Sequence, residues 1–404
     1  MIKCGLLLMA AIVTGAAAAQ AVDLPGQRFS ISPASLPKPH ATAAVANDSK
    51  VIARPPGALP KAPDGFAVSV FADNLSHARW MTVAPNGDIF LAQSDAGKVV
   101  VMRPTSDGTH AAMVSTFAAG FDRPHGLAVH NGSLYVADVK SLWRLRYTDG
   151  ALRASGERVR LAATTPPQGP GHFTRDIVFD SKGTLYLAIG SRENVGQDPL
   201  PFASVQIVNP DGSLSTFASG LRNPVGIAFY PGTDDLYVTV NERDGLGDDL
   251  PPDYLTHIQK GDFFGWPYAY IGNNPDPDYG KKRPDLVAKT KTPDVLFEAH
   301  SAPLGLVFYD GSQFPSDYKG NAFVSLHGSW NRSHPTGYKV VRVKFTNGRP
   351  ENAYENFLTG FWDGVSSPAR VWGRPVGLVV ARDGSLLVAD DAGGRVWRVA
   401  YKPK

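Results

Sequence analysis

Residues 123–129 read Arg-Pro-His-Gly-Leu-Ala-Val, and two residues later the chain continues with Gly-Ser-Leu-Tyr-Val-Ala-Asp at residues 132–138. This unit joins two short apolar runs rich in β-formers through a glycine-containing turn, which is typical of β-strands. The first half of the unit returns, more or less altered, at residues 80–84, 176–179, 223–229, 302–308 and 374–380. The chain therefore contains six copies of one β-rich unit.

The spacing of the copies decides the fold. Their equivalent apolar positions are residues 81, 127, 177, 227, 306 and 378, so the spacings are 46, 50, 50, 79 and 72 residues. A period of about 40–50 residues made of short β-type runs is the sequence signature of a β-propeller. The sequence predicts an all-β protein, a six-bladed β-propeller with four-stranded antiparallel blades and insertions in the fourth and fifth repeats.

Two details of this fold follow from the repeats. The proline before each repeat should cap the loop that enters an inner strand, and the glycine should let neighbouring backbones approach closely near the axis. The run at residues 66–71 has no preceding blade. We therefore expect it to close the ring by pairing beside residues 395–399 in the last blade.

Composition and the N-terminus set the class and the compartment. The chain has 404 residues, of which 43% are hydrophobic and 19% charged, which excludes a disordered or coiled-coil protein. The 40 basic and 37 acidic residues nearly balance, with a net charge of +3, so the composition does not indicate a nucleic-acid-binding surface. Residues 1–21 have the pattern of a secretory signal peptide, which contains the only cysteine, Cys4. The exported chain then has no disulfide, thiolate metal site or attached haem.

We therefore predict three segments. Residues 1–21 are the signal peptide, residues 22–63 are a Pro/Ala-rich N-terminal tail, and residues 64–404 are the propeller, which is the catalytic domain. No later run approaches the length of a membrane span, so we expect no stable membrane insertion. The predicted location is periplasmic or secreted.

Four residues just ahead of the repeats carry charge or an imidazole: Arg123, His172, Arg222 and Arg374. Because loops of adjacent blades converge at one end of a propeller, these side chains could meet in one pocket. A neutral imidazole there suits a general base, and arginines suit a planar, carboxylate-bearing ligand. The alternative for each arginine is a local pair with an aspartate in the blade wall.

A second candidate site lies at residues 241–253, which concentrate acidic side chains and glycines after a predicted strand. Carboxylates and carbonyls in such a loop could bind a hard cation such as Ca²⁺. The segment does not match an EF-hand loop, and Gly245 and Gly247 lack the third glycine and the βαβ setting of a dinucleotide-binding loop. An acidic surface turn remains the alternative.

Three segments together resemble the glucose/sorbosone dehydrogenase family. They are residues 171–194, which begin Gly-His-Phe-Thr-Arg-Asp, residues 220–226 with Arg-Asn-Pro, and residues 261–267, which end Gly-Trp-Pro. The resemblance spans about residues 64–401 and favours the sorbosone and pyranose dehydrogenase branch. It implies a six-bladed propeller that carries pyrroloquinoline quinone (PQQ) and Ca²⁺.

The resemblance also implies roles for individual residues. His172 would be the base that removes the substrate hydroxyl proton, and Arg222 would polarise the quinone oxygen with Asn223 beside it. The residues implied to contact the cofactor are Arg123, His125, Arg222, Asn223, His327 and Arg374. His327 stands where relatives have a lysine. The residues expected at the metal are Glu242 and Arg243, through their carbonyls, with Asp248 and Asp249.

The leading hypothesis is therefore a PQQ- and calcium-dependent dehydrogenase. It would oxidise a sugar or sugar aldehyde, sorbosone-like or an aldose, and would pass electrons to an external acceptor such as a cytochrome or a quinone. Ser191 replaces an aspartate of the glucose-oxidising relatives, which weakens glucose as the substrate. The alternatives are a non-catalytic propeller that binds carbohydrate or protein, and a calcium-dependent lactonase.

Overall fold

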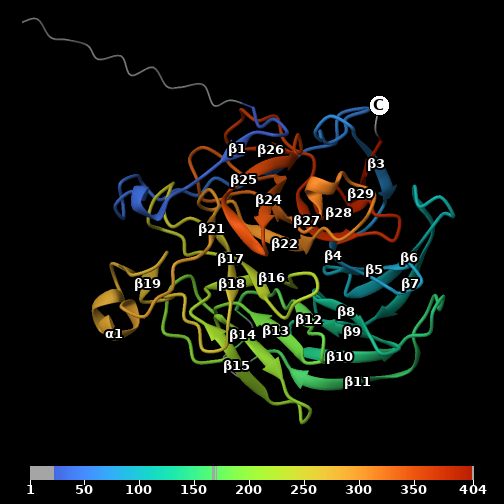
Figure 1. The fold of residues 1–404 in the computed structure, drawn as a ribbon, viewed down its shortest axis with the longest axis horizontal. Coiled ribbons are helices and arrows are strands. Elements are labelled where there is room, and N and C mark those ends of the chain that lie inside the picture. Colours follow the sequence, from blue (N-terminus) through green and yellow to red (C-terminus); the bar gives the residue numbers. More distant parts are fainter. Residues whose placement is uncertain (1–21, 166–168, 170, 403–404) are drawn as a thin grey trace, which may run out of the picture.

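Six antiparallel sheets surround a central axis in the computed structural model, which describes residues 22–165, 169 and 171–402 (Figure 1). Five of the sheets have four strands and one has five. This arrangement confirms the predicted six-bladed β-propeller. The expected signal peptide, residues 1–21, lies outside the described residues.

The blades follow the order of the chain. Blade 1 contains β4 (Ala78–Val83), β5 (Ile89–Gln93), β6 (Lys98–Pro104) and β7 (Ala111–Ala119). Blade 2 contains β8 (Leu127–His130), β9 (Ser133–Ala137), β10 (Ser141–Arg146) and β11 (Ser155–Ala163). Blade 3 contains β12 (Ile177–Phe179), β13 (Leu185–Ile189), β14 (Ser204–Val208) and β15 (Leu214–Ser219).

The later blades take strands from more distant parts of the chain. Blade 4 contains β16 (Asn223–Phe229), β17 (Leu236–Asn241), β18 (Tyr254–Ile258) and β21 (Val295–Leu296). Blade 5 contains β22 (Pro303–Phe308), β23 (Ala322–Leu326), β24 (Lys339–Thr346) and β25 (Arg349–Leu358), with β1 (Arg28–Phe29) on its edge. Blade 6 contains β27 (Pro375–Val380), β28 (Leu386–Asp390), β29 (Arg395–Tyr401) and β3 (Phe66–Ala72).

Blade 6 closes the ring. Its outer strand β3 comes from the N-terminal side of the chain and pairs antiparallel with β29, with Phe66 opposite Tyr401 and Ala72 opposite Val396. The expected pairing of residues 66–71 beside residues 395–399 is confirmed. Strands from both ends of the chain thus form one blade, and this closes the ring between blade 6 and blade 1.

The glycines of the repeats hold the inner strands close together. A Cβ atom on Gly226 would lie only 2.3 Å from the carbonyl oxygen of Leu304 in the next blade, and one on Gly377 would lie 2.6 Å from that of Arg79. Only glycine permits this approach, so the expected role of the glycines is confirmed. The prolines lie at or just inside the strand starts in three repeats, at Pro224, Pro303 and Pro375, and not in the preceding loop. In the third repeat Asp176 takes the glycine position, and its carboxylate accepts a hydrogen bond from the Ile227 N–H at 3.0 Å.

The insertions lie where the long spacings predict them. Residues 259–294, between β18 and β21, contain β19 (Ala269–Tyr270), β20 (Asn274–Pro275), the 3-10 helix η2 (Gly280–Lys282) and the short helix α1 (Pro284–Val287). Blade 5 carries η3 (Ser316–Tyr318) between β22 and β23. The loop after blade 5 holds β26 (Arg370–Val371).

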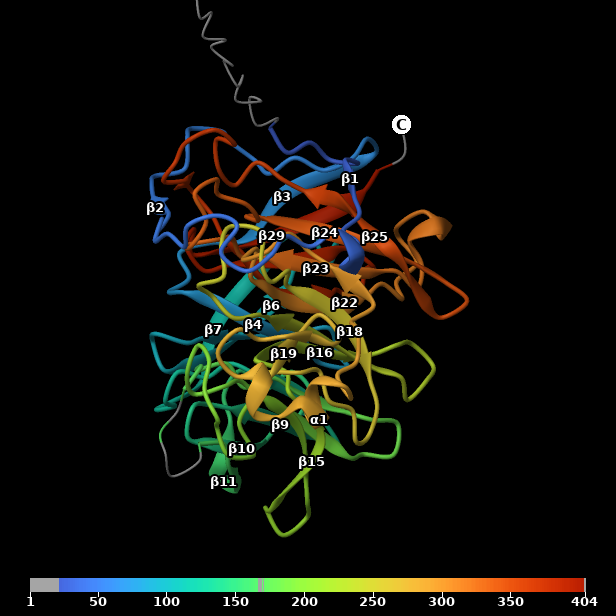
Figure 2. The ribbon, with the colours of Figure 1, turned by 90° about the vertical axis from the view of Figure 1, so that its left-hand side faces the viewer.

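Residues 22–63, expected to be a tail, run along the outside of blades 4, 5 and 6 (blue in Figure 2). The segment contains β1, η1 (Pro33–Ser35) and β2 (Lys50–Val51), and β2 pairs in parallel with β26. Asp23 lies 2.9 Å from the buried ammonium group of Lys339. The boundary near residue 63 remains a prediction, but the segment is bonded to the propeller along its length.

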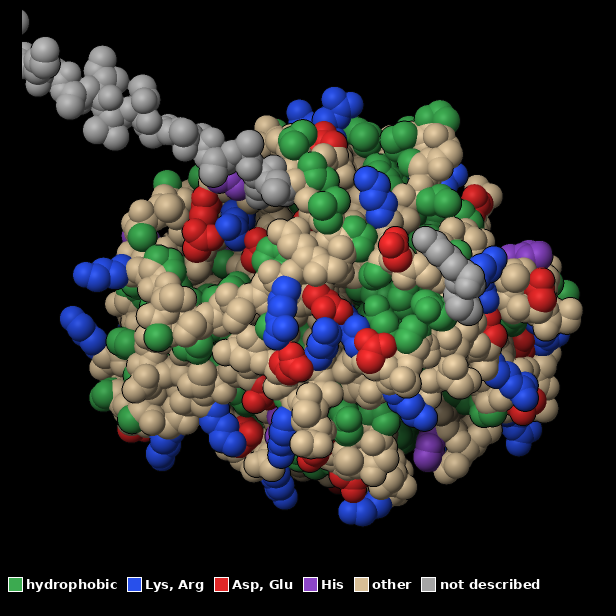
Figure 3. Space-filling view, turned by 45° about the horizontal axis from the view of Figure 1, so that its top comes forward, with side chains coloured by type: hydrophobic (Ala, Val, Ile, Leu, Met, Phe, Trp, Pro, Cys, Tyr) green, Lys and Arg blue, Asp and Glu red, His purple; other side chains and the backbone are tan. Residues whose placement is uncertain are grey.

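The cores of the blades consist of aliphatic and aromatic side chains packed between neighbouring sheets, and the largest fully buried one is Trp397. On the face seen in Figure 3, basic and acidic side chains are interspersed, and neither sign dominates a region. Among the helices of residues 22–402 that the structure describes, none is both long and apolar enough to span a membrane.

Candidate active site

The loops that enter the inner strands enclose a cavity of about 370 Å³ at one end of the propeller, which we call the mouth. All six blades contribute to its lining, which includes Arg79, Arg123, His172, Arg222, Asn223, Glu242, His327 and Arg374. Its size falls in the range of small-molecule sites. The structure thus brings together seven of the residues selected from the sequence, and adds Arg79.

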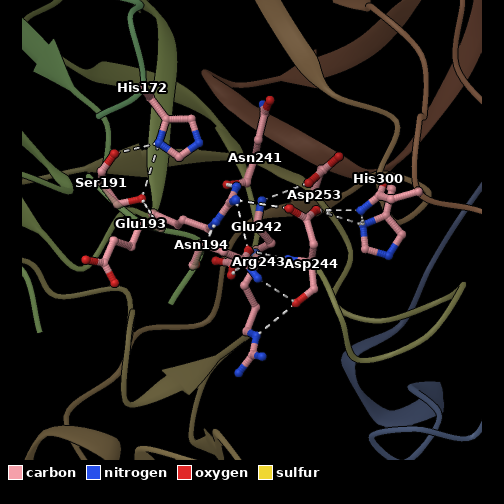
Figure 4. Close-up of polar contacts among 12 residues, drawn as sticks. His172, Ser191, Glu193, Asn194, Asn241, Glu242, Arg243, Asp244, Asp253 and His300 are labelled. Carbon is pink, nitrogen blue, oxygen red and sulfur yellow. Dashed lines mark hydrogen bonds and ion pairs between the residues drawn. The ribbon is translucent and has the colours of Figure 1, made fainter. Parts of the chain in front are cut away.

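His172 is fixed by the backbone of the loop that follows β13. Its Nδ1 lies 2.6 Å from the Ser191 carbonyl oxygen, and because a carbonyl only accepts, Nδ1 carries the hydrogen (Figure 4). Burial and the nearby Arg222 guanidinium lower the pKa of His172 to about 3. The ring is therefore neutral, and its Nε2 is a hydrogen-bond acceptor.

Gly190 makes room for this arrangement. A Cβ atom at residue 190 would lie 2.3 Å from the Asn223 side-chain oxygen and 2.8 Å from the His172 Cβ. Any larger residue would separate the two side chains. The absence of a side chain at residue 190 lets His172 and Asn223 lie side by side in the lining.

Two arginines of the mouth, Arg222 and Arg374, are held mainly by neutral oxygens. Arg222 donates to the Asn194 carbonyl and side-chain oxygens, both at 3.0 Å, and also lies 3.2 Å from Asp244. Arg374 donates to the carbonyls of His327 and Gly328, both at 3.1 Å.

Arg123 differs from the other two. Its guanidinium lies 3.7 Å from the centre of the Phe173 ring, and in the described part of the chain it forms no ion pair. Of the three mouth arginines selected from the sequence, only Arg222 therefore pairs with an aspartate, and it also donates to neutral oxygens.

His327 is backed by a buried carboxylate. Both oxygens of Asp391 lie 3.0 Å from His327 Nε2, and Asp391 also accepts from Arg79. Burial and the neighbouring Arg374 lower the pKa of His327 to about 3, and its imidazole keeps the pKa of Asp391 well below the usual range. Asp391 thus neutralises part of the positive charge that Arg79 and Arg374 bring to the mouth.

Carboxylates gather on the side of the mouth formed by blade 4. Asp253 accepts hydrogen bonds from the N–H groups of Glu242 and Ala302, both at 2.8 Å (Figure 4). Burial raises the pKa of Glu242 to about 8 and that of Asp253 to about 7. The Glu242 Oε1 atom is buried and has no hydrogen-bond partner among the described residues.

Four residues selected from the sequence lie outside the lining. His125 is fully buried and stacks on Trp80, with ring centres 4.3 Å apart. The Arg243 side chain pairs with Asp276. Asp248 accepts from the N–H of Ser333 at 2.9 Å, and Asp249 lies 2.6 Å from Arg332. The two aspartates therefore hold another loop.

Asp244 and Asp253, in the candidate segment 241–253, also line the cavity. The lining residues that the sequence did not assign to a site include Arg79, His300, Trp330 and Asn331. Arg79 stands two residues before its repeat position, so its closeness to a repeat could have indicated it. Trp330 and Asn331 lie in a long connection of the fifth repeat, for which the repeats give no register.

The sequence matches the Glucose / Sorbosone dehydrogenase family over residues 135–330 and the TrAA12-like family over residues 276–402. An uncharacterized protein of Borreliella burgdorferi is 32% identical over 357 residues, which cover 85% of this chain and 91% of that protein. The pyrroloquinoline quinone-dependent pyranose dehydrogenase of Coprinopsis cinerea is 25% identical over 83% of this chain. The matched region spans only 53% of the length of the fungal enzyme.

Solved structures show the same fold. The holo form of the PQQ domain of the Coprinopsis cinerea pyranose dehydrogenase superposes with a TM-score of 0.72 at 21% identity, covering 88% of this chain and 100% of that domain. The calcium structure of a Trichoderma reesei protein of Carbohydrate-Active Enzymes Family AA12 gives 0.70 at 22% identity, covering 85% and 97%. The family-model match over residues 135–330 and the similarity to a PQQ-dependent pyranose dehydrogenase identify the chain as a member of the glucose/sorbosone dehydrogenase family.

Proposed function

We propose that this protein is a PQQ- and Ca²⁺-dependent dehydrogenase that oxidises a sugar or a sugar aldehyde and passes the electrons to an external acceptor. The observation that supports this most directly is the pairing of a neutral, oriented His172 with a ring of arginines in one cavity. The similarity to a PQQ-dependent pyranose dehydrogenase gives the cofactor class.

The residues of the mouth fit PQQ, a planar tricarboxylate. Guanidinium groups match carboxylate oxygens, and hydrogen bonds between such charged groups are the strong ones. Arg123 has no carboxylate partner among the described residues, and the Arg374 guanidinium donates only to carbonyls there. We propose that these two arginines, with Arg222, Asn223 and His327, hold the cofactor.

The residues near Glu242 fit a hard cation. No described residue donates a hydrogen bond to the main-chain carbonyls of Glu242 and Arg243, and the buried Glu242 Oε1 also has no partner there. Ca²⁺ prefers such oxygen ligands, and a cation would lower the raised pKa of Glu242. We propose Ca²⁺ at these oxygens and leave out Asp248 and Asp249, whose carboxylates are bound to Ser333 and Arg332.

The chain's own residues would act as follows. His172 Nε2 would accept the substrate hydroxyl proton, while the Ser191 carbonyl keeps the ring in the required tautomer. Arg222 and Asn223 would stabilise negative charge that develops on an oxygen beside them. When bound, PQQ would supply the acceptor for the hydride from the substrate carbon. We also propose export to the periplasm or the exterior, on the basis of residues 1–21.

The test is reconstitution. The purified protein is mixed with PQQ, with and without Ca²⁺, and calorimetry measures binding while a redox dye reports turnover of a panel of aldoses and of sorbosone. We expect Ca²⁺-dependent PQQ binding and dye reduction with at least one sugar. Absence of PQQ binding would refute the assignment, and PQQ binding without turnover of any sugar would favour the non-catalytic alternative.

A further inference from the structure

Trp330 is unusual among the aromatic residues of this chain. Its side chain is 46% exposed, and it is the only strongly exposed aromatic side chain in the described ranges. It lines the mouth together with His172 and Arg222. Single exposed apolar side chains are common on protein surfaces, but one that lines a polar, concave site is available to a ligand.

The loop around Trp330 is fixed by hydrogen bonds on both sides. The Asn47 N–H donates to the Trp330 carbonyl at 2.5 Å, and the Asn47 side chain donates to the carbonyls of Arg332 and Ser333 at 2.9 and 3.2 Å. Asn331 donates to Asp244 at 2.5 Å. The loop is therefore tied to the N-terminal segment and to blade 4.

The two aspartates outside the lining add to this support. Asp248 accepts from Ser333, and Asp249 pairs with Arg332. The indole itself has no ring partner anywhere in residues 22–402 as far as the structure describes them. A rigid loop thus presents a large unpartnered aromatic surface to the cavity, at little further entropic cost when a ligand binds.

The chemistry of an indole indicates its partner. Its face is broad, flat and electron-rich, and its contact with apolar groups is stabilised by area burial and by the quadrupole of the ring. A cyclic sugar offers a face of C–H groups of similar size, while its hydroxyl groups can bind the polar remainder of the lining. An open-chain sugar aldehyde has no continuous C–H face.

We propose that Trp330 is the platform on which the ring of a cyclic sugar stacks, and that Asn47 is a positioning residue for it. The proposal rests on the proposed function and adds the ring form of the substrate. It also gives residues 22–63 a role at the site, because Asn47 reaches the loop from that segment.

The experiment compares Trp330→Ala, Trp330→Phe and Asn47→Ala with the wild-type full-length chain. Binding of cyclic aldoses is measured by saturation-transfer NMR with and without PQQ and Ca²⁺, and KM and kcat by dye reduction. We expect Trp330→Ala to weaken binding and raise KM for cyclic sugars about tenfold or more, and Trp330→Phe to restore part of this. Asn47→Ala should raise KM about two- to threefold, because the loop keeps its bonds to blade 4.

Three controls separate the proposal from trivial effects. The affinity for PQQ and the melting temperature should be unchanged in Trp330→Ala, because the side chain is exposed. KM for an open-chain aldehyde such as glyceraldehyde should not change. Val365→Ala, a substitution of another exposed apolar residue outside the lining, should behave as the wild type.

The outcomes are distinct. Unchanged binding and KM in Trp330→Ala, or no binding of any cyclic sugar to the wild type, would overturn the role of Trp330. Wild-type protein that binds cyclic sugars through Trp330 but reduces no dye would refute the proposed function while supporting the platform. An equal loss for glyceraldehyde and cyclic sugars would show a general defect of the site and would contradict the proposal.

Discussion

The two ends of the inner strands carry similar charged residues but pair them differently. At the end opposite the mouth, Arg103 donates two hydrogen bonds to Asp88, at 2.9 and 2.8 Å, and Arg398 lies 2.5 Å from Asp383. At the mouth, Arg79 also pairs with a carboxylate, that of Asp391. Arg374 there donates to carbonyls, however, and Arg123 rests on an aromatic ring. Charges paired with carboxylates support the fold, whereas arginines bound to neutral groups keep their charge for an anionic ligand.

Cavity size alone would favour the end opposite the mouth. The cavity beside Asp88 and Arg103 measures about 520 Å³, against about 370 Å³ at the mouth. Its Arg103 and Asp88 are paired with each other, however, and in the described part of the chain no histidine lines it. The chemistry of the lining distinguishes the two cavities better than their volume.

The strongest test of this comparison is His172→Ala. A base within reach of the substrate typically contributes about 10²–10⁴-fold to the rate, so kcat should fall by about that factor. PQQ affinity should not change, because the arginines remain. The matched control is His130→Ala at the opposite end, where the ring stacks on Phe179 with centres 4.2 Å apart. If both variants lose turnover equally, His172 has no special role.

The next test removes one arginine of the mouth. Arg374→Ala should remove a charge-assisted hydrogen bond worth roughly 1.5–3 kcal/mol, or about tenfold or more in PQQ affinity measured by calorimetry. Arg374 also holds the carbonyls of His327 and Gly328, so Arg123→Ala is measured beside it. PQQ affinity that is unchanged in both variants would contradict the arginine-based cofactor site.

The third test concerns the end opposite the mouth, where we expect a substitution to lower stability and to leave PQQ affinity unchanged. Arg103→Ala leaves the buried Asp88 carboxylate without its guanidinium partner, and the free energy of unfolding should fall by about 1–3 kcal/mol. Urea unfolding measures this change. Calorimetry should give the same PQQ affinity for Arg103→Ala as for the wild type. A loss of PQQ affinity at constant stability would remove the distinction between the two ends.

The last test concerns Asp176, the residue directly before β12. Burial raises its pKa from the ordinary 3.8 to about 7, so the folded state holds this proton more tightly than the unfolded chain. The contribution of Asp176 to stability is therefore present at low pH and is lost as pH rises from about 4 to about 7, by at most about 1.4 kcal/mol per unit. Asn cannot ionise, so Asp176→Asn should flatten the decline.

Urea unfolding of both proteins at several pH values between 4 and 7 gives the difference in slope. Other buried carboxylates titrate equally in the two proteins, so the difference reports on Asp176 alone. Identical slopes would show that the carboxylate does not bind its proton more tightly in the folded state.

The sequence by itself determined the blades and part of the mouth. Six copies of one unit fix six similar sheets, because each copy can bury its apolar residues only against its neighbours. The register of those copies also placed His172, Arg222 and Arg374 at one end, since equivalent positions of successive blades occupy equivalent places around the axis. Arg79 also lines the cavity and pairs with Asp391, but it stands two residues before position 81, whereas His172 and Arg222 stand five residues before their equivalents.

Only the tertiary structure decided the partners of residues outside the repeats. Asp248 and Asp249 resemble metal ligands in the sequence, yet their bonds to Ser333 and Arg332 join residues more than 80 positions apart. His125 has the register of a mouth residue but is buried against Trp80. Trp330 lies in a connection whose course is set by Asn47 and blade 4. A repeat predicts where its own copies lie, but contacts between insertions depend on how the closed ring brings distant loops together.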